Sequence, residues 1–323
     1  MGDDHVRPAT VDARAHVTRP RRWLPVRRPR PTARAAAVLV LSLSTAIWGA
    51  SFVFAKELVD RYDPLSVLAL RYSIGTVALW TGRPRAVARL TRSDRRRAAV
   101  IGLLLGTAQV PHYFGVRESS ASTAAFLIGS YVVVTPIVDR LLYGVRTTRT
   151  AAAGAALALC GLAAFAAGGT VSALGLALCL FAAVLYAVQI SALGAWVPPA
   201  NLWGFTTVTM AAITGVVAVP AVVRGVEVPS SPPDWLGVLY LALVAGVAAV
   251  AMQAWAQRRL PATQAAVILV MEPVWATALA VAFTAETPSV QLLIGGAVLL
   301  VANLVVAVGS RRRVVTEGTA APP

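Results

Sequence analysis

Long apolar stretches, separated by short joins of polar and turn-forming residues, make up most of this chain. Each stretch has about the 20 residues that an α-helix needs to cross the hydrocarbon core of a bilayer. The pattern predicts an all-α polytopic membrane protein with ten transmembrane helices. The predicted spans are Ala35–Ala55, Pro64–Thr81, Ala98–Val116, Ser122–Leu142, Ala151–Ala167, Ala173–Ala195, Leu202–Val223, Leu236–Ala256, Thr263–Phe283 and Val290–Val308.

The composition indicates that lipid, rather than water, surrounds most of the chain. Of its 323 residues, 57% are hydrophobic and 13% are charged, and the mean hydropathy is +0.70. A soluble domain has about 25% charged residues, which cover its surface. The charge here is too sparse to form such a surface, so a soluble fold is excluded.

The basic residues favour a membrane topology over a nucleic-acid partner, despite a net charge of +15. They lie in the N-terminal tail, in segment 83–97 and near the C-terminus, rather than on one basic face with aromatic residues. Cytoplasmic segments of membrane proteins are rich in Lys and Arg. With ten spans and a cytoplasmic N-terminus, the outer joins hold only Lys56, Arg61, Arg117 and Arg224. We therefore expect both termini in the cytoplasm. The preference for Arg over Lys, with abundant Ala, suggests a GC-rich bacterial genome and hence the bacterial inner membrane.

The second half of the chain repeats the pattern of the first. Leu105-Gly106 corresponds to Ala245-Gly246, 140 residues later, and the segments that follow, 122–126 and 262–266, are also alike. Each repeat holds five predicted helices, and an odd number makes the second copy enter the membrane from the opposite side. The prediction is two inverted five-helix repeats, with the solute site between them. The expected segments are a disordered basic tail over 1–34, repeats over 35–168 and 172–309, and a cytoplasmic tail over 310–323.

Several motifs together resemble the ten-helix EamA-like family of the drug/metabolite transporter superfamily. Trp48-Gly49-Ala50-Ser51-Phe52 resembles the signature of its first helix, and Leu70-Arg71-Tyr72 resembles its second. Ala121–Pro136 is similar to the fourth helix, and Gln257-Arg258-Arg259 through Glu272-Pro273 to the ninth. The resemblance covers roughly residues 36–309. It implies an alternating-access carrier of small metabolites or drug-like solutes, often an exporter.

Glu272 is the sharpest candidate for a transport residue. It is predicted near the middle of its span, where a carboxylate is costly and by default suggests function. Pro273 follows it and frees a backbone carbonyl one turn earlier, near Leu269. Pro136 is a second predicted kink. Glu272 could bind a cationic group or a proton, or it could be a structural acid bonded to polar neighbours.

Arg71 and a set of aromatic and amide side chains complete the candidate site. Arg71 could hold a substrate carboxylate or pair with Glu272, or its long stem could let it snorkel to the outer headgroups. Trp48, Tyr131, Tyr186 and Trp255 could stack on a solute, although packing or membrane-belt roles are common for such residues. Gln189 and Gln253, like Gln109, need polar partners inside the membrane and therefore face the bundle or the pathway. His112, near the outer end of its span, reads as a loop-proximal residue rather than a proton relay.

The sequence argues against catalysis by this chain. Of three histidines, His5 and His16 lie in the tail, and the two cysteines lie inside apolar runs without metal-ligand spacing. Phosphate-binding glycine motifs are also missing from the sequence. We expect no metal, no cofactor and no enzymatic activity, and a secondary transporter of a small solute, with proton coupling as a hypothesis and homo-oligomerisation left open. The alternatives are a passive channel or facilitator, and a polytopic membrane enzyme or scaffold that transports nothing.

Overall fold

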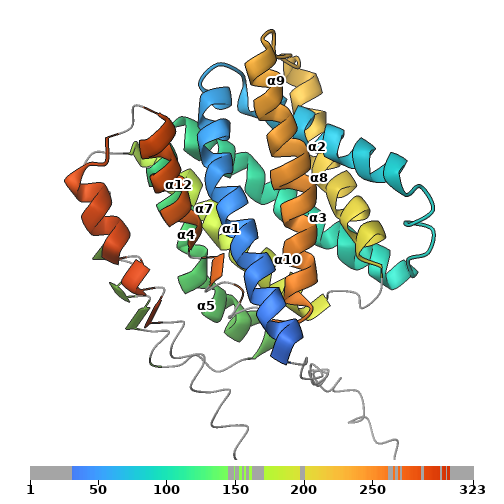
Figure 1. The fold of residues 1–323 in the computed structure, drawn as a ribbon, viewed down its shortest axis with the longest axis horizontal. Helices are drawn as coiled ribbons and strands as arrows, with labels where there is room; N and C mark the ends of the chain where they lie inside the picture. The colour runs from blue at the N-terminus through green and yellow to red at the C-terminus, as the bar shows by residue number, and fades with distance from the viewer. Residues whose placement is uncertain are drawn as a thin grey trace, which may run out of the picture.

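The computed structural model describes residues 31–144, 171–196, 201–260, 271–284 and 287–298, with a few short stretches between these ranges and up to residue 305. Nearly all of these residues are helical, and the helices form one bundle (Figure 1). The elements are α1 (Pro31–Val59), α2 (Pro64–Gly82), α3 (Arg92–Arg117), α4 (Ala121–Gly129), α5 (Tyr131–Tyr143), α7 (Ala173–Trp196), α8 (Leu202–Arg224), α9 (Pro232–Leu239), the π-helix η1 (Tyr240–Ala248), α10 (Ala249–Gln257) and α12 (Met271–Phe283).

Six helical segments of the described part are long and apolar enough to cross a membrane. Met271–Phe283 and Val290–Ala302 are shorter apolar helices, and α2 has 19 residues with Arg71 near its middle. The six segments are Thr32–Val59, Arg92–Arg117, Ala121–Leu142, Ala173–Gly194, Leu202–Arg224 and Pro232–Gln257. The chain is thus a multi-pass membrane protein. Most of the predicted span Ala151–Ala167 lies outside the described residues, so the number of ten spans stays a prediction.

Side-chain caps explain where the helices begin. Asp63 accepts a hydrogen bond from the backbone N–H of Leu65, and Thr91 accepts one from Asp94. Such caps satisfy N–H groups that have no partner inside the helix. The cap at Thr91 means that α3 begins at Arg92, six residues before the predicted start at Ala98. The arginines at 92–97 therefore form the first turns of a helix rather than a loop.

Two interruptions inside spans were not predicted. A one-residue turn at Ser130 separates α4 from α5, before the predicted kink residue Pro136, which lies inside α5. In the span that continues from α9 to α10, the middle nine residues form the π-helix η1. Such wide turns are rare and are frequent at functional sites.

We call the end of the bundle where α3 begins the arginine end, and the other end the opposite end. At the opposite end, Lys56 near the end of α1 donates to the carbonyl of Arg117, the last residue of α3. Ser119, just past α3, forms an isolated β-bridge with Val171, just before α7. It follows that α1 and α3 run toward the opposite end, and α7 runs away from it.

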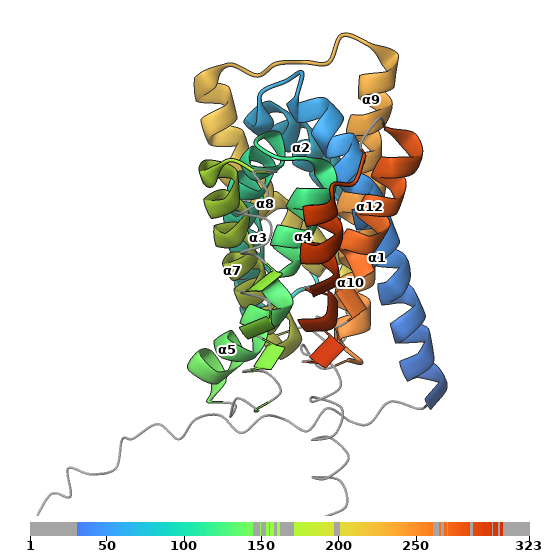
Figure 2. The ribbon, with the colours of Figure 1, turned by 90° about the vertical axis from the view of Figure 1, so that its left-hand side faces the viewer.

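Helices of the two halves pack mainly against each other. α1 packs against α10 and α12, whereas α2 and α3 pack against α8, and α3 also packs against α7 (Figures 1 and 2). Glycines permit the closest approaches between helices. A Cβ at Gly102 would lie 2.4 Å from the carbonyl oxygen of Thr209, which is too close for any side chain. The halves are therefore interleaved rather than separate, and a site in the centre draws residues from both.

Large apolar side chains cover the outside of the bundle. Leu39, Leu141, Val223 and Phe283 are each more than 70% exposed, and all four lie on apolar helices. Water would disfavour so much exposed apolar surface, but the hydrocarbon of a bilayer does not. This surface agrees with a protein that is surrounded by lipid.

Candidate functional site

A cavity of about 70 Å³ lies inside the bundle, between helices of both halves. A single water needs roughly 10–15 Å³ of such space, so the cavity has room for several waters or part of a solute. Its polar and aromatic lining consists of Trp48, Ser51, Arg71, Tyr72, Gln109, His112, Tyr131, Tyr186, Gln189, Gln253 and Glu272. Its apolar lining consists of Leu105, Ile128, Ile190, Val250 and Leu269.

Arg71 is held inside the bundle by aromatic side chains of α2 and α3. The residue is only 4% exposed, so its side chain does not extend to the end of the helix, as snorkelling would require. Its Nη1 donates to the hydroxyl of Tyr113, and its Cζ lies 4.9 Å from the ring centroid of Tyr72. Within the described residues, its Nε has no hydrogen-bond partner.

Glu272, Tyr131 and the carbonyl of Leu269 form a second polar group on the cavity wall. The Tyr131 hydroxyl lies 3.2 Å from the Leu269 oxygen and 3.4 Å from Oε2 of Glu272. Pro273 has no N–H, so the Leu269 carbonyl lacks its usual helical donor, and Tyr131 supplies one from another helix. The ion pairs of the described residues do not include one between Glu272 and Arg71.

His112 faces the cavity, and its placement corrects our interpretation of it as a loop-proximal residue. Its Nδ1 lies 2.7 Å from the hydroxyl of Tyr186, and its ring centroid lies 5.1 Å from that of Phe52. The signal for this was present in the sequence: Leu105, Gln109 and His112 are spaced i, i+4, i+7, which places them on one helix face.

The remaining candidates divide between the cavity and its surroundings. Trp48 lines the cavity and donates through Nε1 to the carbonyl of Ala245 in η1, at 2.9 Å. The amides of Gln189 and Gln253 also line it. Trp255 is not part of this lining; the guanidinium of Arg259 lies 3.8 Å from its ring centroid.

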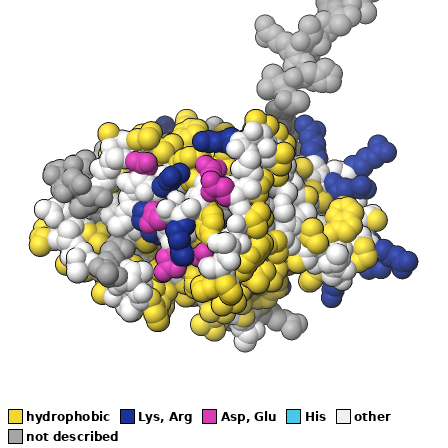
Figure 3. All heavy atoms as spheres, turned by 90° about the horizontal axis from the view of Figure 1, so that it is seen from above, with side chains coloured by type: hydrophobic (Ala, Val, Ile, Leu, Met, Phe, Trp, Pro, Cys, Tyr) yellow, Lys and Arg dark blue, Asp and Glu magenta, His cyan; other side chains and the backbone are white. Residues whose placement is uncertain are grey.

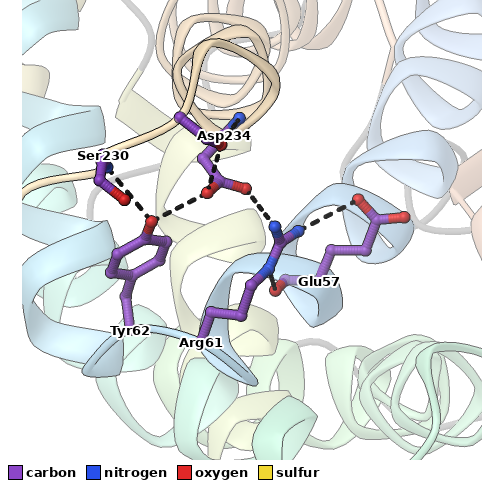
Figure 4. A network of polar contacts seen from close by, with 6 residues as sticks. Glu57, Arg61, Tyr62, Ser230 and Asp234 are labelled. Atoms are coloured by element: carbon purple, nitrogen blue, oxygen red, sulfur yellow. Dashed lines mark hydrogen bonds and ion pairs between the residues drawn. The ribbon is translucent and has the colours of Figure 1, made fainter.

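A polar network joins the two halves at the opposite end of the bundle, and Asp234 is its centre (Figure 4). Oδ2 of Asp234 accepts hydrogen bonds from Tyr62 at 2.8 Å and Ser231 at 2.7 Å, and Arg61 lies 2.6 Å from Oδ1. Tyr62 and Arg61 follow α1, whereas Ser231 and Asp234 begin α9. Seen from above, acidic and basic side chains gather on this face among hydrophobic ones (Figure 3).

Further hydrogen bonds join the connection between α1 and α2 to the segment that precedes α9. The backbone N–H of Asp63 donates to Glu227 at 2.6 Å, and the N–H of Glu227 donates to Ser66 at 3.0 Å. We call these contacts, with those of Asp234, the inter-repeat network. It ties residues 61–66 to residues 227–234 at this end of the bundle.

Among the described residues, no group of three or more His, Cys, Asp or Glu side chains is placed to hold a metal ion. The polar groups of the cavity are instead a cation, a carboxylate, three amides and several aromatic hydroxyls. These groups suit reversible binding of an organic solute, with a separate anchor for each of its polar ends.

Comparisons with known proteins agree with this architecture. The sequence profile of the EamA-like transporter family matches twice, over residues 35–166 and 171–308. An uncharacterized transporter of Archaeoglobus fulgidus is 26% identical over 273 residues, which is 84% of this chain and 86% of that protein. A protein of known crystal structure has the same fold, with a TM-score of 0.66 at 19% identity; the match covers 86% of this chain and 99% of that one.

The apolar helices, the family match and the transporter relative show a multi-pass membrane transporter of small solutes. The chain belongs to the EamA-like transporter family, with two copies of the family repeat. The resemblance noted from its motifs is therefore confirmed.

Proposed function

We propose that this protein is a secondary transporter that exports a small amphipathic metabolite or drug-like solute across a bacterial inner membrane by alternating access. The observation that carries the proposal is the cavity, which combines a buried cation, a carboxylate and aromatic rings between the two family repeats. An amphipathic solute needs such mixed surroundings, because its polar ends must keep partners inside the membrane.

Helix directions support two inverted repeats. α1 opens the first family match and runs toward the opposite end, whereas α7 opens the second and runs toward the arginine end. Equivalent helices that run in opposite directions are what an inverted repeat requires. With the arginine end in the cytoplasm, as the positive-inside rule suggests, both termini are cytoplasmic and the inter-repeat network is external.

Alternating access then requires the inter-repeat network to break. Its bonds run between the halves, and Arg61 and Glu227 are exposed, whereas Asp234 is buried. Charged groups that can exchange their partners for water are only weakly held together. The network therefore suits a gate that closes the external side in one state and releases it in another.

Glu272 is proposed as the coupling residue. It lines the cavity beside Tyr131 and makes no ion pair within the described part of the chain. Among the described lining residues, Glu272 is the one carboxylate, so it is the acidic group of the cavity that could carry a proton. Protonation from one side and release to the other would drive export of the solute.

The first test compares metabolites in the medium of cells that express the gene and of cells that carry an empty vector. A solute found in this way is then followed in proteoliposomes. A carrier shows saturation and counterflow, in which unlabelled solute inside the vesicle drives labelled solute inward. Flux that rises linearly with concentration, without counterflow, would indicate a channel and overturn the carrier mechanism.

The coupling residue is tested by Glu272→Gln, with Glu118→Gln as its control. Glu118 has the same side chain, but it is exposed at the opposite end and lies outside the inter-repeat network. The proposal expects Glu272→Gln to remove the pH dependence of transport and Glu118→Gln to keep it. Equal pH profiles for the wild type and Glu272→Gln would eliminate Glu272 as the coupling site.

A further inference from the structure

Arg71 is a buried cation without a protein counter-ion among the residues that the structure describes. Its contacts are the neutral Tyr113 hydroxyl and the faces of the Tyr72 and Tyr113 rings. Ring faces and hydroxyls stabilise a guanidinium only in part, and a buried charge is costly unless it is paired. The site is therefore incomplete in the protein alone, and an anion would complete it.

The guanidinium edge that remains free has the geometry of a carboxylate site. Tyr113 occupies Nη1, which leaves the edge that carries Nε, and this Nε has no hydrogen-bond partner in the described part of the chain. Two parallel N–H groups on such an edge match the two oxygens of a carboxylate. Arg71 lines the cavity, but its Nε has almost no accessible surface, so a carboxylate reaches this edge only when neighbouring side chains move.

The partner groups that share the cavity do not supply this anion. Glu272 lines the same cavity, but its carboxylate lies beside Tyr131 and forms no ion pair with Arg71. Gln109 lies one helical turn before Tyr113 on α3, so it faces the same region. Its Oε1 is buried without a hydrogen-bond partner within the described residues, so it could accept from a donor group of the solute when the same side chains move.

We propose that Arg71 binds the carboxylate of the transported solute, and that the solutes are organic monocarboxylates with an apolar or aromatic body. This inference rests on the proposed transport function. Arg71 is the one Arg or Lys in the cavity lining, so it matches a single negative charge better than the double charge of a phosphate ester. Trp48, Tyr72 and Tyr186 offer rings against which an apolar body can pack.

The test uses three probes with one carbon skeleton: 3-phenylpropanoate, 3-phenylpropanamide and 3-phenylpropylamine. Each is assayed for counterflow in proteoliposomes and for thermal stabilisation of the purified protein, with chloride alone as a fourth condition. The wild type should bind and carry the carboxylate and discriminate against the amide and the amine. Charge-assisted hydrogen bonds contribute enough that Arg71→Gln should weaken carboxylate binding by roughly 10–100-fold.

Two further variants separate binding from folding. Arg71→Lys keeps the charge but loses the planar guanidinium, so it should weaken carboxylate binding. Without ligand, its melting temperature should lie closer to that of the wild type than the melting temperature of Arg71→Gln does. Arg224→Gln is the control, because Arg224 is 58% exposed at the end of α8 and is remote from the cavity lining. It should bind the carboxylate as the wild type does.

The possible failures are distinguishable. If the amide or the amine is carried as well as the carboxylate, the transporter proposal holds and the carboxylate assignment is wrong. If chloride alone stabilises the wild type as strongly as the carboxylate, and Arg71→Gln abolishes this effect, Arg71 is a chloride site and the assignment is again wrong. If none of the probes binds or moves, both proposals are contradicted.

Discussion

Gly49→Ala is predicted to push apart two helices that carry the candidate site. Gly49 lies on α1 beside Trp48, where the backbone passes very close to α12. A Cβ at this position would lie 2.5 Å from the Cβ of Trp275, 2.9 Å from the backbone nitrogen of Ala276 and 3.0 Å from the carbonyl oxygen of Glu272. None of these atoms is the mobile end of a flexible side chain, so the helix itself has to move.

The size of the effect follows from these distances. Carbon atoms are in favourable contact at about 3.5–4.0 Å, so the helices must separate by about 1 Å. Overpacking of this kind costs about 1–3 kcal/mol. Replacing Gly by Ala inside a helix returns up to about 1 kcal/mol. Three contacts of 3.0 Å or less, two of them to backbone atoms, place the cost at about 2–3 kcal/mol. The net expectation is a destabilisation of about 1–2 kcal/mol, together with slower transport, because the displaced segment contains Glu272.

The assay compares the melting temperature and the transport rate of this variant with those of Gly215→Ala. Gly215 is also in a helix, on α8, but no atom lies within 4 Å of the position of its Cβ. The control should therefore melt at or above the temperature of the wild type, and Gly49→Ala should melt several degrees lower. If both variants melt and transport alike, the close approach of α1 and α12 does not constrain the protein, and the reasoning is refuted.

Three further substitutions each remove one hydrogen-bonding side-chain group. Trp48→Phe keeps an aromatic ring but leaves the Ala245 carbonyl without its donor, so it should destabilise the protein by about 1–3 kcal/mol; an unchanged melting temperature would contradict this. Tyr131→Phe removes the donor to the Leu269 carbonyl, so it should lower stability by a similar amount. It should also alter the pH profile of transport, and an unaltered profile would disprove this expectation. Tyr62→Phe removes the bond to Asp234 and the contact with the backbone N–H of Ser230, so it should increase labelling of a cysteine in the cavity from the external side; equal labelling would show that these contacts do not hold the gate.

The sequence could predict the features that depend on whether a residue lies in lipid or in water. Apolar length located the six segments of the described part that are long enough to cross a membrane, because hydrocarbon accepts few polar residues. The same rule singled out Arg71 and Glu272, since a charge at membrane depth needs a reason. The freed carbonyl near Leu269 followed from the missing N–H of Pro273, and the structure adds that Tyr131 is its donor.

The features that could not be predicted depend on contacts between distant segments. The π-helix at Tyr240–Ala248 has an ordinary apolar sequence, and its carbonyl at Ala245 meets the indole of Trp48 only in the folded bundle. Asp234 lies in a join rich in Pro and Ser, and its role in the inter-repeat network depends on Tyr62, 172 residues earlier. The position of His112 near the end of α3 suggested a place beside a loop. Its side chain instead shares a helix face with Gln109, and both residues line the cavity.

The central claim is that a solute crosses the membrane through the cavity between the two repeats. Gln109→Cys tests it directly, in a chain whose Cys160 and Cys179 are replaced by Ala, because Gln109 lines the cavity and is buried from the bundle surface. A thiol reagent that cannot cross lipid is applied from each side of reconstituted vesicles. The account predicts labelling from both sides, and protection from both by a transported solute. A cysteine that reacts from one side only, or from neither, would contradict it.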